Sequence, residues 1–413
     1  MTERAPGSPS ADAGAPALAG PTAVSGAPAV PEPAVHAELL DCLQVNLALL
    51  ADRHHGAGTH LRLGARPRFA PRQGEGALPS TEPTLAEHLA DAEDLLGLVV
   101  TDHRRRVPGA ELASVTEAVY VVADAYYLPW VPYHGTKHVE HSFLVGPDGD
   151  GLAVEDAYHN DTQWGRARPQ RLRYGREELA DLVDSLPEGA EVVWLGPKPP
   201  GPAPEPVAPG AGDAADHARR CEEYVRHFTE HPDRVEALDR FTLETWLLAR
   251  ARRLHARYRF GDAELPPAVA EHLARWDGVV EHAYLAYRRV ARGRAEPPEL
   301  LARAADALRA DAELLAAAPG PAPSAGLGDG DEAQALHAAV RATVAAVLGT
   351  TAEHLPDDDL TALPAFTSLR MVEIVEQLET AYEVEFAASD LVPEKLHRLA
   401  DLTELVRRAQ RDA

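Results

Sequence analysis

Residues 366–386 read FTSLRMVEIVEQLETAYEVEF, and this stretch predicts an amphipathic helix that begins at Ser368. Its apolar side chains recur every three or four residues, which is the spacing of one helical face. They are Leu369, Val372, Val375, Leu378 and Tyr382. Thr367 directly precedes the helix and is a competent N-cap, because its hydroxyl accepts from a free backbone N–H of the first turn. We therefore expect Ser368 at the start of a helix with its hydroxyl near the surface.

Two further amphipathic helices flank this one. The helix before it is marked by Leu336, Val340, Val344 and Val347, and the one after it by Leu396, Leu399, Leu402 and Leu405. A long acidic loop, LGTTAEHLPDDDLTALPAF at 348–366, joins the first two helices. Three such helices bury their apolar faces most simply by packing together. The sequence therefore predicts a small helical bundle over residues 332–413.

This whole bundle resembles the acyl and peptidyl carrier family around its modified serine. The resemblance rests on the Ser-Leu pair at the helix start, the Val-Glu-rich helix and the closing segment DLVPEKLHRLADL. It implies that Ser368 carries 4'-phosphopantetheine, attached covalently from CoA by a phosphopantetheinyl transferase. The family usually has Asp before this serine, where Thr367 stands here. The alternative is that Ser368 only helps to cap a helix in an unmodified bundle.

Three glutamates, Glu373, Glu376 and Glu379, share one face of the same helix. A solvated face is the ordinary account of such charges. The other account is a docking surface for basic patches on partner enzymes. The sequence leaves both open.

Segments rich in Ala, Pro and Gly divide the rest of the chain. We expect a disordered N-terminal tail and two Pro-rich linkers, at 1–33, 196–212 and 318–331. They separate three domains, at 34–195, 213–317 and 332–413. A chain of 413 residues agrees with this division, because it exceeds what one hydrophobic core usually supports.

Composition limits the partners. The chain has 65 acidic against 40 basic Lys and Arg residues and a formal net charge of −25, which argues against nucleic acid and anionic membranes. Its two cysteines, Cys42 and Cys221, suggest a reducing compartment. No apolar run has the length of a membrane span or the form of a signal peptide. We expect a cytoplasmic protein.

The domain at 34–195 mixes helix and strand patterns. A helical run, CLQVNLALLADRHHG, covers 42–56. Apolar runs of strand type follow at 115–127, 141–146, 152–158 and 191–196. PDGDG at 147–151 predicts a β-hairpin between the second and third. The domain therefore reads as α+β with an antiparallel sheet, whereas 213–317 is helical throughout by composition and spacing.

Cys42 stands at the start of the helical run, after Asp41 as a plausible N-cap. The positive end of a helix dipole favours the thiolate there. His141 opens one strand of the hairpin, and Asp156 ends the other, so the two should lie side by side. A nucleophile on a helix start, with a base and an orienting acid on a sheet, is the arrangement of a nucleophilic triad.

The motifs DCLQVNLALL, ADAYYLPW, HVEHSFLVG and VEDAYHNDTQWG resemble the papain-like cysteine peptidase fold. They are still more similar to the butirosin-biosynthesis H-type acyltransferases, in which a helical half also follows the cysteine domain. The resemblance implies that Cys42 is the nucleophile, His141 the general base and Asp156 its orienter. Papain-like enzymes place an oxyanion-stabilising Gln six positions before the cysteine, and here that position is His36.

Other assignments remain open. Cys42 could be a buried, unreactive thiol. His134 or His138 could serve as the base, and Asn160 or Asp161 could hold the histidine in place of Asp156. A metal site is not expected, because ligand-like spacing is lacking. Nothing suggests chemistry for Cys221.

A carrier joined to a cysteine domain predicts acyl transfer. The acyl or aminoacyl group would pass from the phosphopantetheine thioester to Cys42 and then to a small-molecule amine acceptor, forming an amide. An adenylating enzyme would load the carrier, and the pathway would make a specialised metabolite. The alternatives are a peptidase or thioesterase that uses water, and a catalytically inactive module that presents the carrier.

Overall fold

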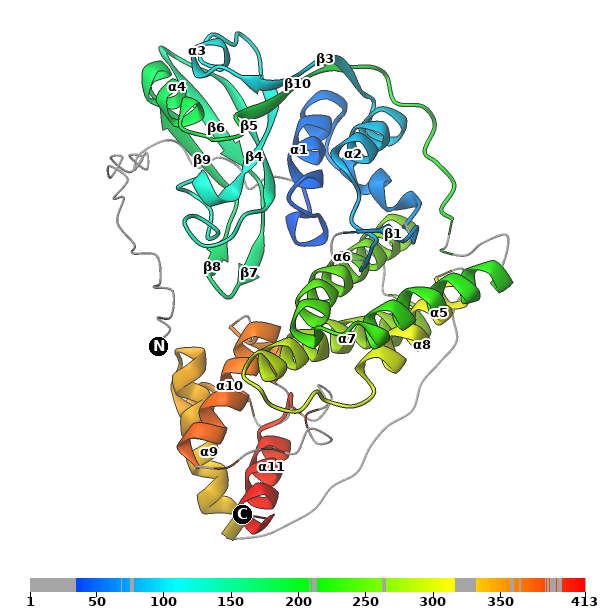
Figure 1. Ribbon diagram of the computed structural model, residues 1–413, viewed down its shortest axis with the longest axis vertical. Helices are drawn as coiled ribbons and strands as arrows, with labels where there is room; N and C mark the ends of the chain where they lie inside the picture. The colour runs from blue at the N-terminus through cyan, green and yellow to red at the C-terminus, as the bar shows by residue number, and fades with distance from the viewer. Residues whose placement is uncertain are drawn as a thin grey trace, which may run out of the picture.

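The computed structural model describes residues 35–67, 69–74, 78–207, 209, 214–261, 265–315, 332–356, 360–363, 365–382, 384, 386, 391 and 396–412. The expected tail at 1–33 and the linker at 318–331 lie outside these ranges. Figure 1 shows a sheet-containing part at one end of the molecule, a bundle of α9, α10 and α11 at the other, and α5 to α8 between them.

Six antiparallel strands form the main sheet in the order β3-β10-β4-β5-β6-β9. Their bounds are Leu98–Val107 (β3), Ala190–Pro197 (β10), Val119–Asp124 (β4), Glu140–Asp148 (β5), Gly151–Asp156 (β6) and Gln170–Tyr174 (β9). Two short pairs stand apart, Arg72–Gln73 with Pro79–Ser80 (β1, β2) and Asn160–Thr162 with Gly165–Ala167 (β7, β8). The prediction of helix together with antiparallel sheet is confirmed.

Both faces of this sheet are covered, and successive side chains of a strand point to opposite faces and so enter two different cores. On one face Val121 and Phe143 join a core with α4, Arg176–Asp184, and the short α3, Gly109–Leu112. On the other face Tyr120 and Leu144 pack against α1, Gln44–His55, and against the turns that follow α2, Leu85–Asp91. Figure 1 shows these helices on opposite sides of the sheet.

The predicted hairpin is present, since β5 pairs with β6 through Asp148 opposite Gly151. The sequence patterns missed β3 and β9. β3 reads LVVTDHRRRV, and its charged half is exposed on an edge strand, so the usual apolar alternation is hidden. β9 lies at the opposite edge and reads QRLRY, with only two buried side chains. Edge strands have weaker apolar patterns because fewer of their side chains reach the core.

Helix α1 begins two residues later than the sequence pattern suggests. The Oδ1 atom of Asp41 accepts from the backbone N–H groups of Leu43 and Gln44, at 2.9 and 2.8 Å, so Asp41 caps the first turn as expected. Cys42 therefore lies in the turn between this cap and the helix. The helix ends at Gly56, whose φ of 101° is costly for residues with a Cβ atom.

The middle of the chain consists of long helices, α5 (Ala214–Glu230), α6 (Arg234–Phe260), α7 (Pro267–Ala291) and α8 (Leu300–Leu314). A buried carboxylate, Asp311, joins three of these helices: it pairs with Arg252 at 2.5 Å and accepts from His272 and Trp276 at 2.9 Å. A buried charge held by such partners fixes how the helices pack.

The C-terminal bundle has its three helices at Glu332–Leu348 (α9), Ser368–Ala381 (α10) and Leu399–Asp412 (α11). The side chain of Thr367 accepts from the N–H of Arg370 at 3.3 Å, so the predicted N-cap is confirmed. Short 3-10 turns at Ala352–His354 and Leu360–Ala362 lie in the long acidic loop. The three helices share one buried core, to which they contribute Val340, Met371 and Leu402 in turn.

Helix α6 also packs against the sheet-containing part. The backbone of the 3-10 turn Thr59–Ala65 (η2) approaches α6 so closely at Gly64 that a Cβ atom there would clash with the carbonyl of Leu254. His255 contacts the carbonyl oxygen of Gly64 at 2.7 Å, and Glu244 accepts from the N–H of Thr81 at 2.6 Å. The first and middle parts of the chain therefore share an extensive packed boundary.

Candidate functional site

Cys42 lies against the start of β5. Its sulfur is 3.4 Å from the carbonyl oxygen of Glu140, the residue before His141. Its own carbonyl accepts from the hydroxyl of Ser142, the residue after His141, at 2.5 Å. Cys42 as a residue is half-buried. The structure thus brings the predicted nucleophile to the backbone on both sides of the predicted base.

His141 and Asp156 are held together as the sequence predicts. The Nε2 atom of His141 lies 2.7 Å from Oδ2 of Asp156, and both side chains are buried. Asp156 also accepts from the indole N–H of Trp130 at 3.2 Å and from the backbone N–H of Tyr158 at 3.0 Å. A carboxylate held by three donors is a fixed acceptor, so it orients the imidazole with Nε2 protonated.

The other ring nitrogen of His141, Nδ1, differs from Nε2 in its surroundings. Nδ1 is buried and has no hydrogen-bond partner within the described ranges of the chain. The ring of Tyr158 stands edge-on to the imidazole at 5.3 Å, and Tyr158 and Cys42 belong to the same apolar cluster. With Nε2 committed to Asp156, Nδ1 is the ring nitrogen that remains to accept a proton.

Asn46, one turn after Cys42, fixes this arrangement from inside α1. Its side-chain NH₂ donates to the carbonyl and to the hydroxyl of Ser142, at 2.8 and 3.0 Å. Its carbonyl oxygen accepts from the N–H of Ala157 at 3.0 Å. Asn46 is fully buried and touches the residues next to both His141 and Asp156. One amide therefore ties the helix of Cys42 to both strands of the hairpin.

Arg250 of α6 contacts the backbone on both sides of the candidate site. Its guanidinium donates to the carbonyl oxygens of Ala37 and Leu40, at 3.2 and 2.5 Å, just before Cys42. It also donates to the carbonyl oxygen of His159 at 3.0 Å and lies 4.2 Å above the ring of Trp246. The middle helices therefore contribute a cation that clamps the cysteine loop to the turn after Asp156.

The pKa of Cys42 departs from the sequence-based expectation. Burial raises the pKa of this thiol well above its ordinary value, and the negative charges of Asp41, Glu82 and Asp156 raise it further. The prediction that the helix dipole favours the thiolate is therefore wrong, because loss of solvation outweighs the dipole. Attack by sulfur needs a base that accepts its proton at that moment.

The rival bases lie elsewhere. His134 and His138 are both exposed, and His138 stacks on Tyr126 and contacts Asp124 at 2.6 Å. The rival orienters are also engaged elsewhere. Asn160 donates to the hydroxyl of Tyr158, and Asp161 pairs with Arg168. The geometry favours His141 and Asp156.

His36, at the position of the papain-like Gln, takes part in a histidine pair. Its Nδ1 lies 3.0 Å from Nε2 of His60, and its backbone N–H donates to the same atom at 3.1 Å. The Nδ1 of His60 in turn lies 2.8 Å from Asp52. The ring of His36 is thus oriented by buried His60, which Asp52 holds in turn.

Ser368 is the first residue of α10. The first residue of a 14-residue helix lies at the positive end of the helix dipole, which favours a negative charge nearby.

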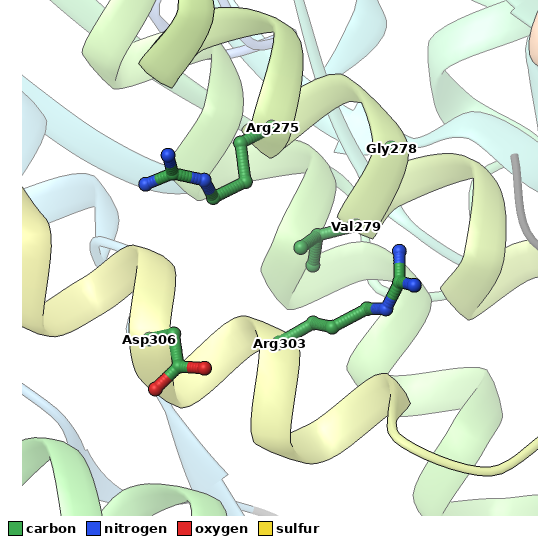
Figure 2. A pocket seen from close by; sticks show the side chains of 5 residues that line it. All are labelled: Arg275, Gly278, Val279, Arg303 and Asp306. Carbon is green, nitrogen blue, oxygen red and sulfur yellow. The ribbon is translucent and has the colours of Figure 1, made fainter. Parts of the chain in front are cut away.

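A surface pocket of about 350 Å³ lies between α7 and α8, away from the cysteine and from α10. Arg275, Gly278, Val279, Arg303 and Asp306 line it. Figure 2 shows that the two guanidinium groups extend in opposite directions. They do not converge on one point, so the pocket is no anion site. Cys221 is buried in the core of α5 to α8, where burial raises its pKa to about 12.

Several residues of the site escaped sequence reasoning. Asn46 offered a signal, because a polar residue within the apolar pattern of α1 must find buried partners. Trp130 and Tyr158 lie inside quoted motifs but had no assigned role. Arg250 gave no signal, since its partners are about 90 to 210 positions away.

Comparison with protein families places a phosphopantetheine attachment site at residues 338–406. The C-terminal bundle is therefore a carrier domain with covalently attached 4'-phosphopantetheine, served by a phosphopantetheinyl transferase and loading enzymes. No curated protein matches the chain. Among the described helices, none has the length and apolar character needed to cross a membrane. Nor do the described residues bring three His, Cys, Asp or Glu side chains into a metal-binding group.

Proposed function

We propose that this chain is an acyltransferase that forms amides through an acyl-enzyme on Cys42. The observation that carries the proposal is the lone Nδ1 of His141, buried beside the loop of Cys42 while Nε2 is fixed on Asp156. An imidazole with this tautomer is a general base directed away from its orienting carboxylate. The resemblance to the butirosin-type acyltransferases supports the same roles.

The carrier domain supplies the acyl group as a thioester when its arm is attached and loaded, and we infer that Ser368 is the attachment residue. His141 accepts the proton of the Cys42 thiol as the sulfur attacks the carbonyl carbon. The new bond joins Cys42 sulfur to that carbon. The bond to the departing thiol breaks, and the proton on His141 passes to that thiol.

An amine acceptor then attacks the acyl group on Cys42. His141 accepts the proton that the amine loses, the C–N bond forms and the C–S bond to Cys42 breaks. The sulfur recovers a proton from His141. Asp156 stays ionised throughout and stabilises the imidazolium that forms in each step. The backbone N–H of Cys42 would donate to the oxyanion, since those of Leu43 and Gln44 are taken by Asp41.

The proposal extends to the setting of the reaction. An adenylating enzyme would load the acyl or aminoacyl group, and the acceptor would be a small amine in a specialised-metabolite pathway. Amide formation from a thioester is downhill, so the transfer itself needs no nucleotide.

The test uses the full-length protein with its arm attached and loaded with a labelled acyl group. We expect label on a Cys42 peptide after quenching, and a labelled amide when an amine is added. Cys42→Ala should abolish both, and Cys221→Ala, which removes the other thiol, should keep both. Mass spectrometry of peptides and products provides the readout.

Three outcomes would contradict the proposal. Free acid as the main product in the presence of amine would indicate a hydrolase. Amide formation that survives Cys42→Ala would show direct attack on the carrier thioester. An arm that still attaches to Ser368→Ala would refute the attachment residue.

A further inference from the structure

The acidic face of α10 is covered by arginines of the chain's own middle part. Glu376 pairs with Arg288 at 3.2 Å and with Arg292 at 2.5 Å. Glu379 pairs with Arg289 at 3.4 Å and with Arg294. All four arginines lie in the last turns of α7 or directly after it. Figure 1 shows the bundle of α9 to α11 placed against this end of α7.

Apolar and backbone contacts accompany these ion pairs. Leu285 of α7 belongs to the buried core of the carrier bundle, and Tyr284 packs against that core. The guanidinium of Arg289 also donates to the carbonyl oxygen of Phe386 at 3.3 Å. The contact thus has an apolar centre and a charged rim, which is how specific protein interfaces are built.

The ion pairs of the two glutamates differ in how far their side chains are exposed. The side chains of Glu379 and Arg289 are 5% and 6% exposed, whereas that of Arg292 is 45% exposed. Exposed pairs contribute little stability and are weakened by salt, while buried pairs mainly fix which partners fit. An interface with both kinds is selective and still able to open.

Contacts near Ser368 set the orientation of the carrier. The ring of Phe366, two residues before Ser368, stands edge-on to His397 at 5.7 Å. His397 in turn contacts Glu281, in the middle of α7, at 2.9 Å. The start of α10 therefore lies toward the middle of α7, and its later turns lie along the arginines.

From the middle of α7 a short series of contacts leads to the cysteine loop. Asp277, one turn before Glu281, pairs with Arg253 of α6. Arg250, about one turn before Arg253, donates to the carbonyl of Leu40 beside Asp41 and Cys42. The carrier therefore sits with the start of α10 toward the part of α6 and α7 that adjoins the candidate site.

We propose that the end of α7 is a docking surface for the chain's own carrier domain, which binds there reversibly and directs the start of α10 toward the cysteine site. The docking rests on the contacts above, and its use for acyl delivery rests on the proposed function. Docking covers Glu376 and Glu379. Modifying and loading enzymes that bind this face of α10 therefore meet it only in the released state.

The test reverses the charges of the more exposed pair, because Glu379 also accepts from the N–H of Phe386 inside the carrier. Arg288→Glu with Arg292→Glu should release the carrier in the full-length protein. We expect the radius of gyration in small-angle scattering to rise by about 2 Å or more, roughly a tenth of the value for a compact chain of this length. Adding Glu376→Arg should restore the wild-type value, because it mirrors the original charges.

Matched controls carry the same charge changes elsewhere. Arg275→Glu with Arg303→Glu alters the other side of α7, at the pocket of Figure 2, and should leave the radius unchanged. Glu373→Arg removes a glutamate that pairs with Arg370 of its own helix and should also have no effect. Equal expansion in these controls would overturn the docking, as would a failure of Glu376→Arg to restore it.

Two further readouts separate the parts of the proposal. A radius and mass that grow with protein concentration would show docking between copies and overturn docking within one chain. Scattering needs no catalysis, so the dock can be established even where Cys42→Ala retains activity and the acyltransferase proposal fails. Conversely, Cys42-dependent transfer with an unchanged radius in Arg288→Glu, Arg292→Glu would refute the dock alone.

Discussion

The cysteine site and the contact between α7 and α10 both join distant parts of the chain, but they use different interactions. At the site, Asn46, Asp156 and Ser142 are buried, and their partners include backbone groups at about 3 Å. At the rim of the α7–α10 contact, side chains of opposite charge meet, and that of Arg292 is 45% exposed. Backbone hydrogen bonds inside a core fix a geometry, whereas exposed ion pairs form and separate at little cost. The first region therefore suits the proposed acyl transfer, and the second suits the proposed docking.

The largest effect should come from the base. His141→Ala leaves the Cys42 thiol without a proton acceptor, so single-turnover acyl transfer in the loaded, full-length protein should slow by roughly 10²- to 10⁴-fold. His138→Ala provides the matched control, because that exposed histidine contacts Asp124 instead, and its rate should stay near wild type. A greater loss in His138→Ala than in His141→Ala would reverse the assignment.

The reactivity of Cys42 tests the raised pKa. A thiol is nucleophilic only when deprotonated, so a pKa raised by burial moves alkylation to higher pH. Each unit above the ordinary value of about 8.5 lowers the thiolate fraction at pH 7 about tenfold. Iodoacetamide labelling of Cys42 at pH 7 should therefore be at least about tenfold slower than that of a free thiol. Buried Cys221 should react later still. A plateau of labelling below pH 6 would reveal a preformed ion pair with His141 instead.

Removing the amide of Asn46 should loosen the site. Asn46→Ala leaves the buried N–H of Ala157 and the carbonyl of Ser142 without their partner, at a cost of about 1–3 kcal/mol in the free energy of unfolding. Urea unfolding followed by tryptophan fluorescence measures it. His54→Ala, on the exposed face of the same helix, should change stability little. Equal stability of both variants would mean that Asn46 does not hold the hairpin.

A higher salt concentration should have the smallest effect on the transfer rate, and it should act on the α7–α10 contact but not on the cysteine site. Between 0.1 and 1 M salt the screening length falls from about 10 to 3 Å, which weakens exposed ion pairs. Transfer from the chain's own carrier should slow a few-fold, since such pairs contribute about 0.2–1 kcal/mol each. Transfer from a small free thioester, which needs no docking, should not change. A parallel fall in both rates would place the salt sensitivity in the cysteine site.

Local patterns predicted much of this molecule. The apolar stripe of 366–386 identified α10 and its N-cap, and the PDGDG turn identified the β5–β6 hairpin. That hairpin in turn brought His141 close to Asp156, because alternate residues of two paired strands share one face of the sheet. Each of these inferences concerns residues within about 20 positions of one another, over which backbone geometry alone carries the prediction.

The sequence did not predict contacts between distant residues or the burial of individual side chains. The contact of Arg250 with the cysteine loop depends on how α6 packs, and the arginines of α7 gave no sign of their partners in α10. The glutamates of α10 were open to two interpretations, and only the structure shows their pairing within the chain. The pKa of Cys42 was predicted in the wrong direction because burial depends on the whole fold rather than on the helix start.

The close approach of Gly64 to α6, together with the clamp of Arg250, bears on how such a chain can be recombined. A cut between the sheet-containing part and the middle helices, at the Pro-rich segment that looks like a natural boundary, would strip the carbonyls of Ala37 and Leu40 of their donor. The surface of η2 that packs against α6 at Gly64 would be exposed as well. The carrier is therefore the part that can be exchanged between chains, whereas the sheet-containing part and the middle helices should be kept together. Chimaeras should be joined after α8 rather than before α5.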